Sequence, residues 1–167
     1  MAQSAEWKEK TVNPVAEKLA KHFEGYSLPP YYCPAGVLTG GYGHAFRAGE
    51  TVRDLPEPEA TEVLTQDLSD AELATYRHCP ALLTEPEARA GAIIDFTFNL
   101  GVGRLQASTL RRRINQRNWP EAVRELRRWV YAAGRKLPGL VLRREAEAAY
   151  LSRSPGLQVS QSPPEAP

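Results

Sequence analysis

Four side chains with chemical potential lie close together near the start of the chain, between residues 23 and 44. Glu24 is an acid, Cys33 is a thiol nine residues later, Thr39 is a hydroxyl six residues further on, and His44 is an imidazole. Prolines, tyrosines and glycines separate them, whereas the rest of the chain has mostly helical patterns. We therefore expect any chemistry to reside in this stretch.

Glu24 falls in the last turn of a predicted helix and directly follows Phe23. The C-terminus of a helix carries partial negative charge, and apolar neighbours disfavour an ionised carboxylate, so both circumstances favour the protonated form. A protonated carboxyl beside a sugar oxygen is the general acid of glycoside hydrolysis. Many glutamates end helices without such a role, so Glu24 taken alone favours the structural interpretation.

Cys33, Thr39 and His44 are also ambiguous when taken singly. A carboxylate at position 33 would indicate an inverting glycosidase, which holds a water between two carboxyl groups about 6.5–9.5 Å apart. A thiol is mostly neutral at pH 7, and packing is the more common role of a cysteine. Thr39 can hold a water against Cys33 or can be an ordinary strand residue. His44 has no Cys or His partner at metal-ligand spacing, which favours a structural hydrogen bond.

Composition limits the class of protein. The 167 residues suit one compact domain, and 42% of them are apolar, enough for a core. A formal net charge of +1 argues against strong nonspecific binding to nucleic acid. Cys33 and Cys79 form neither a zinc motif nor a disulfide framework, although one bridge between them is conceivable. We expect no metal and no cofactor.

Hydropathy gives no indication of a membrane segment. No run reaches the roughly 18 apolar residues of a membrane span, and the first ten residues lack the apolar region of a secretory signal. We therefore expect no stable membrane insertion.

Periodicity predicts a mainly helical chain with one small hairpin. The hairpin lies within 26–47, where Pro34 and Gly36 predict a turn. The sequence from Thr84 to Glu87 is typical of a capping box, and the apolar helix after it belongs at the centre of a helical lobe. The predicted helices cover about 6–24 (with a start near Pro14 equally compatible), 54–77, 85–100, 108–115, 118–131 and 140–151.

The predicted fold class is α+β, mainly α. A hairpin lobe at about 26–53 and a helical lobe at about 80–152 are joined by a long helix, with a binding cleft between the lobes. Residues 1–153 form the predicted catalytic domain, and residues 154–167, rich in Pro and Ser, form a predicted disordered tail.

Several separated motifs resemble one known family. The sequence E-G-Y-S-L-P-P-Y-Y-C-P-A-G-V-L-T-G-G-Y-G-H, from Glu24 to His44, is similar to E-G-x-R-L-x-A-Y-x-C-P-A-G-x-x-T-I-G-Y-G-H of phage lysozymes of the T4 type, glycoside hydrolase family 24. Residues 92–103 resemble its A-L-x-S-F-x-F-N-x-G-x-G, and residues 139–147 resemble its G-L-x-x-R-R-x-x-E. The resemblance covers about residues 10–152, in order, which makes it specific.

The resemblance implies a lysozyme-like fold and muramidase activity, the hydrolysis of the β-1,4 bond between N-acetylmuramic acid and N-acetylglucosamine in peptidoglycan. It implies that Glu24 is the general acid and that Cys33 and Thr39 position or activate the water. The cysteine form of the second position occurs within the family.

The resemblance also implies residues that bind substrate or support the site. By analogy, Asn99 and Arg144 line the cleft, and Arg143 beside them is a further candidate for binding sugar groups, although two arginines otherwise indicate a solvated face. His44 and Tyr42 are expected to support the site structurally. Ser27 stands where the family usually has an arginine, which removes a possible buried partner of the acid, and Gly40 replaces the usual isoleucine and is expected to loosen the strand.

The expected biology is that of an endolysin acting for host cell lysis. The enzyme is made in the bacterial cytoplasm, depends on a separate holin for membrane passage, reaches the cell wall from the periplasm, and works as a monomer. Two alternatives stay open at this point. A lytic transglycosylase needs one acid/base and no activated water, and a non-catalytic peptidoglycan-binding protein would use the cleft as a lectin does.

Overall fold

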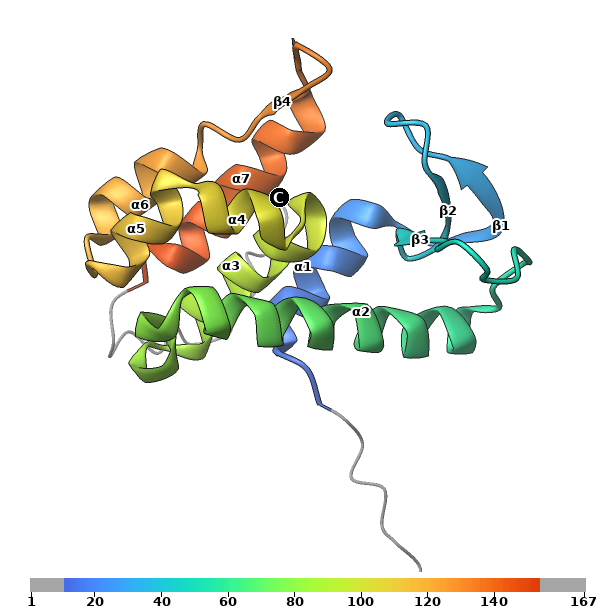
Figure 1. The fold of residues 1–167 in the computed structure, drawn as a ribbon, viewed down its shortest axis with the longest axis horizontal. Coiled ribbons are helices and arrows are strands. Elements are labelled where there is room, and N and C mark those ends of the chain that lie inside the picture. Colours follow the sequence, from blue (N-terminus) through green and yellow to red (C-terminus); the bar gives the residue numbers. More distant parts are fainter. Residues whose placement is uncertain (1–10, 154–167) are drawn as a thin grey trace, which may run out of the picture.

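The structure is a computed structural model, and it describes residues 11–153. The tail predicted at 154–167 lies outside the described residues, as do residues 1–10. The described chain has the predicted α+β, mainly α, architecture, with a small sheet at one end of a long helix and a group of helices at the other (Figure 1). The helices are α1 (Pro14–Glu24), α2 (Glu57–His78), the 3-10 helix η1 (Pro80–Thr84), α3 (Glu87–Leu100), α4 (Val102–Ala107), α5 (Thr109–Asn115), α6 (Trp119–Leu126) and α7 (Pro138–Leu151).

Helix α1 begins at Pro14, the later of the two predicted starts. The side chain of Asn13 accepts hydrogen bonds from the backbone of Val15 and Ala16 at 3.0 and 3.1 Å, so it caps the free N–H groups of the first turn. Proline suits the first position because it has no N–H to satisfy. Gly25, with a φ of 67°, ends the helix. This stop leaves Glu24 as the last helical residue.

The predicted hairpin is part of a three-stranded antiparallel sheet. Strands β1 (Ser27–Tyr32), β2 (Leu38–Gly41) and β3 (His44–Ala45) follow one another in space in chain order. The third strand has only two residues, too few for a recognisable alternation in the sequence. Gly40 is buried in β2, and a Cβ there would lie 3.0 Å from the ring of Phe46, so the glycine leaves room for that ring. The loosening expected at this position stays a prediction.

Helix α2 joins the two ends of the molecule. Its first turns lie under β2 and β3, and it also packs against α3 and α4, as Figure 1 shows. Within residues 11–153, no helix has both the length and the hydropathy that a membrane span needs.

Helix α3 is the centre of the helical lobe, as its apolar sequence predicts. Every residue from Gly91 to Thr97 is buried, and α1, α2 and α7 pack around the helix. Gly91 allows the closest of these contacts, because a Cβ there would lie 2.6 Å from the Cβ of Val15 in α1. The position of α1, and of Glu24 at its end, is therefore set by α3.

Some predicted boundaries are wrong. The capping box fails because Thr84 is part of η1, and α3 begins after Pro86 without a side-chain cap. Helix α4 lies between the predicted helices 85–100 and 108–115, where the sequence predicts no helix. The helix expected to reach residue 131 ends at Leu126, and β4 (Tyr131–Ala132) pairs with β5 (Arg135–Lys136) after it. Ala133 and Gly134 both have positive φ, 48° and 75°, which is the backbone of a two-residue hairpin turn.

Candidate active site

Glu24 is held by an arginine from the far end of the chain. Nη1 of Arg143, in α7, donates to Oε1 of Glu24 at 2.6 Å, and the Glu24 side chain keeps 22% of its surface exposed. The structure thus supplies a buried partner for the acid, although Ser27 replaces the arginine that the family usually has. The exposed remainder of the carboxyl is available to a ligand.

The turn between β2 and β3 closes against the same carboxyl. Gly43 has a φ of +76°, and a Cβ there would lie 2.6 Å from Oε2 of Glu24. Only glycine meets both conditions, since it adopts positive φ without strain and has no Cβ to collide. The G-Y-G-H sequence therefore has a direct structural purpose beside the acid.

Cys33 starts the turn between β1 and β2, where its N–H donates to the carbonyl of Val37 at 2.9 Å. Partial burial acts to raise the pKa of its thiol. Hydrogen bonds from the backbone of Val37 and Ala35 and from the side chain of Thr39 outweigh burial, so the pKa lies below its ordinary value. The charge of Glu24 acts on the same thiol in the raising direction. Acid and thiol are therefore electrostatically coupled.

Thr39 is buried in β2, beside Cys33. Its hydroxyl donates to the carbonyl of Val37 at 3.0 Å and lies within hydrogen-bonding reach of the Cys33 sulfur. Tyr31, paired with Thr39 across the strands, completes this group. Burial raises the pKa of Tyr31, and the charges of Glu24 and Cys33 raise it further. The structure thus brings Glu24, Cys33 and Thr39 together and adds Tyr31, which the sequence did not single out.

His44 connects the sheet to α2. Its Nδ1 lies 2.7 Å from Oδ2 of Asp67 and its Nε2 lies 2.9 Å from Oε1 of Glu50. Burial acts to lower the pKa of His44, but the hydrogen bonds to Asp67 and Glu50 prevail and raise it. These contacts agree with the structural hydrogen bonds predicted for this residue.

Tyr42 also faces α2. Its hydroxyl donates to Oε1 of Glu57 at 2.7 Å, and its ring lies 5.5 Å from that of Tyr26. The contact to Glu57 raises the pKa of the Tyr42 hydroxyl. Its supporting role in the site stays a prediction.

The two arginines of α7 are buried, so the solvated-face interpretation is wrong. Arg144 has no exposed surface, and its Nη2 donates to Asn99 at 2.9 Å and to Glu147 at 2.7 Å. Arg143 binds Asp95 and Glu24. In this conformation Arg144 does not reach a ligand directly and instead orients Asn99, which is partly exposed. Asp95 and Glu147 were not singled out in the sequence. The signal for Asp95 was an acid inside an otherwise apolar helix, and the signal for Glu147 was its match to the last position of the G-L-x-x-R-R-x-x-E motif.

A pocket of about 460 Å³ lies between the sheet, α2 and the end of α3. Gly43, His44 and Phe46 line it near β3, Asp67 and Ala71 line it from α2, and Thr97 and Phe98 line it from α3. Of the predicted site residues, His44 lines this pocket, whereas Glu24, Cys33, Thr39 and Asn99 do not. A binding cleft beside Glu24 stays a prediction.

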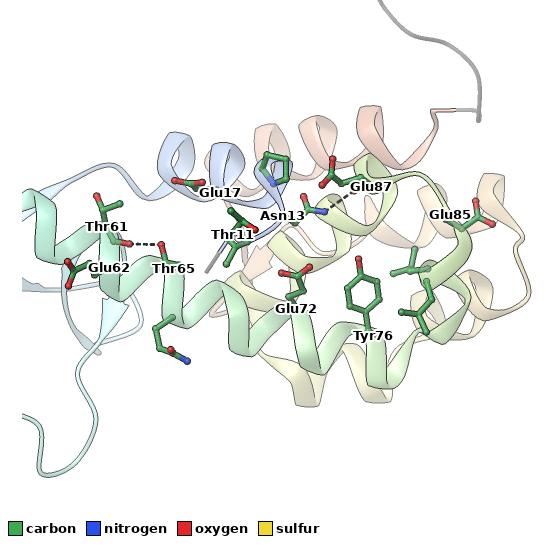
Figure 2. Close-up of a pocket in the computed structure, with 15 residues that line it drawn as sticks. Thr11, Asn13, Glu17, Thr61, Glu62, Thr65, Glu72, Tyr76, Glu85 and Glu87 are labelled. Atoms are coloured by element: carbon green, nitrogen blue, oxygen red, sulfur yellow. Dashed lines mark hydrogen bonds between the residues drawn. The ribbon is translucent and has the colours of Figure 1, made fainter. Parts of the chain in front are cut away.

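A second pocket, of about 1090 Å³, lies elsewhere (Figure 2). It is formed by the start of α1, by α2, by η1 and by the start of α3, and its wall is acidic, with Glu72 and Glu87 among its side chains. Burial raises the pKa of Glu72, and the charge of Glu87 adds to this. None of the predicted site residues lines this pocket. Among residues 11–153, no group of three or more His, Cys, Asp or Glu side chains could hold a metal ion.

Comparisons with known proteins agree with this geometry. The family model described as phage lysozyme matches residues 21–147. The SAR-endolysin of bacteriophage PS34 is 38% identical over 124 residues, which cover 74% of this chain and 73% of that protein. The SAR-endolysin of Enterobacteria phage P21 is 36% identical over 124 residues, covering 74% of each chain.

A solved structure supports the fold independently. The endolysin from Escherichia coli O157:H7 phage FAHEc1 superimposes with a TM-score of 0.72 at 25% identity, over 85% of this chain and 93% of that one. The family model, the sequence identity to relatives and the fold all indicate the same family. The chain belongs to the phage lysozyme family, and it is a glycoside hydrolase of the lysozyme, or muramidase, type.

Proposed function

We propose that the enzyme hydrolyses the β-1,4 bond between N-acetylmuramic acid and N-acetylglucosamine in peptidoglycan, with Glu24 as the general acid. The observation that carries the proposal is the position of the Glu24 carboxyl, which Arg143 holds by a hydrogen bond of 2.6 Å and Gly43 packs against, while 22% of the side chain stays exposed. A fixed, partly exposed acid is what protonation of a glycosidic oxygen needs.

Cys33 and Thr39 are proposed to hold the attacking water. The Thr39 hydroxyl lies within hydrogen-bonding reach of the Val37 carbonyl and of the Cys33 sulfur, and its lone pairs are left to accept a hydrogen bond from a water. The lowered pKa of Cys33 increases its thiolate fraction, and a thiolate accepts a hydrogen bond from a water. The water then attacks the anomeric carbon and passes its proton to the Cys33 thiolate, while the glycosidic C–O bond on the opposite face breaks and its oxygen takes the proton of Glu24. The anomeric configuration inverts.

Asn99 is proposed to bind the sugar, held in place by Arg144. In this arrangement Arg144 contributes to binding through Asn99 rather than by direct contact.

The Glu24→Gln variant tests the assignment. Glutamine keeps the size and one acceptor but cannot donate the acid proton, so release of fragments from purified sacculi is expected to fall by about 10³-fold or more, within the range for a lost general acid and its associated stabilisation. Thermal melting of the variant, measured in parallel, reports whether the fold persists. Fragment release at the wild-type rate by a folded variant would exclude Glu24 as the acid.

A lytic transglycosylase is the second candidate, because position 33 carries a thiol where a carboxylate would activate water more strongly. Mass spectrometry of the released fragments separates the two reactions. Reducing ends identify the hydrolase, and 1,6-anhydro ends identify the transglycosylase.

The route to the wall is a separate part of the proposal. We propose that the enzyme acts as a monomer from the periplasmic side after a holin permeabilises the inner membrane. Two relatives are named SAR-endolysins, so the dependence on a holin is the part of the proposal that most needs a test. The holin dependence is measured by comparing the lysis of cells that express this chain with and without a co-expressed holin. Lysis without the holin would contradict the proposed dependence.

A further inference from the structure

We infer that Asp95 is a positioning residue for the general acid. It fixes Arg143 and balances its charge, so that the Glu24 carboxyl is held in place without facing an uncompensated cation. The inference rests on the proposed role of Glu24. It adds a residue from the core of the molecule to a site that otherwise lies beside the predicted cleft.

The geometry gives Asp95 control over Arg143. Oδ2 of Asp95 accepts from Nε of Arg143 at 2.8 Å, and Oδ1 accepts from Nη2 at 2.7 Å. A bidentate pair of this kind fixes the plane of the guanidinium. The third side of the group, Nη1, is then directed at Oε1 of Glu24, 2.6 Å away. Three helices, α1, α3 and α7, meet at this one guanidinium.

Burial makes the pair indispensable. The Asp95 side chain has no exposed surface and that of Arg143 has 4%. A charge buried so fully needs a partner, because desolvation is not repaid otherwise. Neither side chain can therefore turn out into solvent, and the pair stays together beside Glu24.

A salt bridge to arginine is by itself a poor setting for a general acid. A neighbouring cation favours the ionised carboxylate, whereas the reaction needs the carboxyl to hold a proton. Although burial opposes the charge of Arg143, Asp95 and then Glu24 raise the pKa of its guanidinium, so it is a permanent cation. The negative charge of Asp95 offsets that cation, and Glu24 faces a nearly neutral pair.

The other charged and titratable groups near Glu24 do not supply this offset. Glu147 lies 3.9 Å from Nε of Arg143, but it accepts from Nη2 of Arg144 at 2.7 Å, so its charge is matched by Arg144. Tyr31 and Cys33 face Glu24 from the sheet and are acids that are neutral in their common form. Asp95 is the group that balances Arg143.

The Asp95→Asn variant removes the charge and keeps the size. The uncompensated Arg143 should favour ionised Glu24, so the alkaline limb of the pH profile of kcat/KM is expected to move to lower pH by about one unit. Above that limb kcat falls by roughly tenfold while KM changes little. A purely structural role would lower Tm without moving the limb.

Glu85→Gln is the matched control. Glu85 is also a buried carboxylate, 8% exposed, that pairs with two arginines, Arg89 and Arg117, and it lies at the second pocket, away from Glu24. We expect Glu85→Gln to lower Tm and to leave the pH limb in place. If it moved the limb as far as Asp95→Asn does, the inference would be overturned.

Arg143→Gln keeps the test decisive if Asp95→Asn does not fold. Losing the cation leaves the negative charge of Asp95, so the alkaline limb should move to higher pH, opposite to Asp95→Asn. The double variant, which is neutral at both positions, should return the limb toward the wild-type value. The inference is contradicted if the alkaline limb does not move in the two single variants, or if it moves in the same direction in both. The proposed function is tested separately. If the wild-type enzyme releases reducing ends and Glu24→Gln does not, the proposed function holds whether or not the inference about Asp95 does.

Discussion

Gly43 and Glu24 pack so closely that no side chain fits between them. A Cβ at position 43 would lie 2.6 Å from Oε2 and 2.8 Å from Cδ of Glu24. Because Gly43 lies in the turn between β2 and β3 and Glu24 is the last residue of α1, this contact fixes the position of the sheet relative to α1 at the site itself.

The contact predicts a large effect of Gly43→Ala on activity. The methyl group must displace the Glu24 carboxyl, and a shift of about 1 Å at a catalytic group costs about 100-fold in rate. Gly134→Ala is the control, since Gly134 has almost the same φ, +75°, with nothing within 4 Å. Both variants should lose about 1–2 kcal/mol of stability from backbone strain. Equal fragment release by the two variants would show that the contact does not position the acid.

Gly91→Ala is predicted to destabilise the enzyme although alanine is the better helix former. Alanine gains about 1 kcal/mol of helix propensity, but its Cβ would lie 2.6 Å from that of Val15, and overpacking costs about 1–3 kcal/mol. Gly103 in α4 has open space around it, so Gly103→Ala should instead stabilise. Urea unfolding of both variants gives the two free energies, and stabilisation by Gly91→Ala would contradict the close contact of α1 and α3.

Cys33 is predicted to react with iodoacetamide far faster than Cys79. Both thiols are free, but Cys33 is partly exposed with a lowered pKa, whereas burial raises the pKa of Cys79 to about 12. Alkylation is carried out by the thiolate, so the difference should exceed tenfold at pH 7. Peptide mass spectrometry locates the label, and fragment release should fall as Cys33 is modified. Full activity after complete labelling of Cys33 would exclude it from the water site.

His44 is predicted to make the stability of the enzyme depend on pH. Its folded-state pKa is raised, so its ion pairs with Asp67 and Glu50 contribute fully below the unfolded value of about 6.5 and are lost as the pH rises through the folded value. His44→Gln should cost about 2 kcal/mol at pH 5.5 and less at alkaline pH. Thermal melts from pH 5 to 9 measure this, with the exposed His22→Gln as the control. A loss that grows with pH would reverse the sign and refute the prediction.

The sequence was most informative where a local pattern decides the structure. The apolar helix containing Phe96 and the end of the first helix at Glu24 appear as expected. The helices predicted from 108 and 118 also form, with Ser108 and Asn118 as their caps. Strands of two residues, such as β3 and β4, carry too little pattern to be recognised. The capping box at Thr84 fails because the preceding 3-10 helix already uses that residue.

The charged network could not be predicted, because its members are far apart in the chain. Arg143 is separated from Asp95 by 48 residues and from Glu24 by 119. A pair of arginines on a helix ordinarily indicates a solvated face, and only the three-dimensional packing shows the carboxylates that allow them to be buried. Family resemblance identified Glu24, Cys33 and Thr39, but not the residues that hold them.

The burial of α3 from Arg89 to Thr97 has a consequence for how the enzyme loses activity. The amide hydrogens from Ala92 to Phe96 have no local opening that reaches solvent, so they should exchange only when the whole lobe unfolds. Asp95 is among them, and the partners of Glu24 are packed on the same helix. Inactivation by heat should therefore follow global unfolding directly, with no earlier stage in which a folded enzyme has already lost its acid.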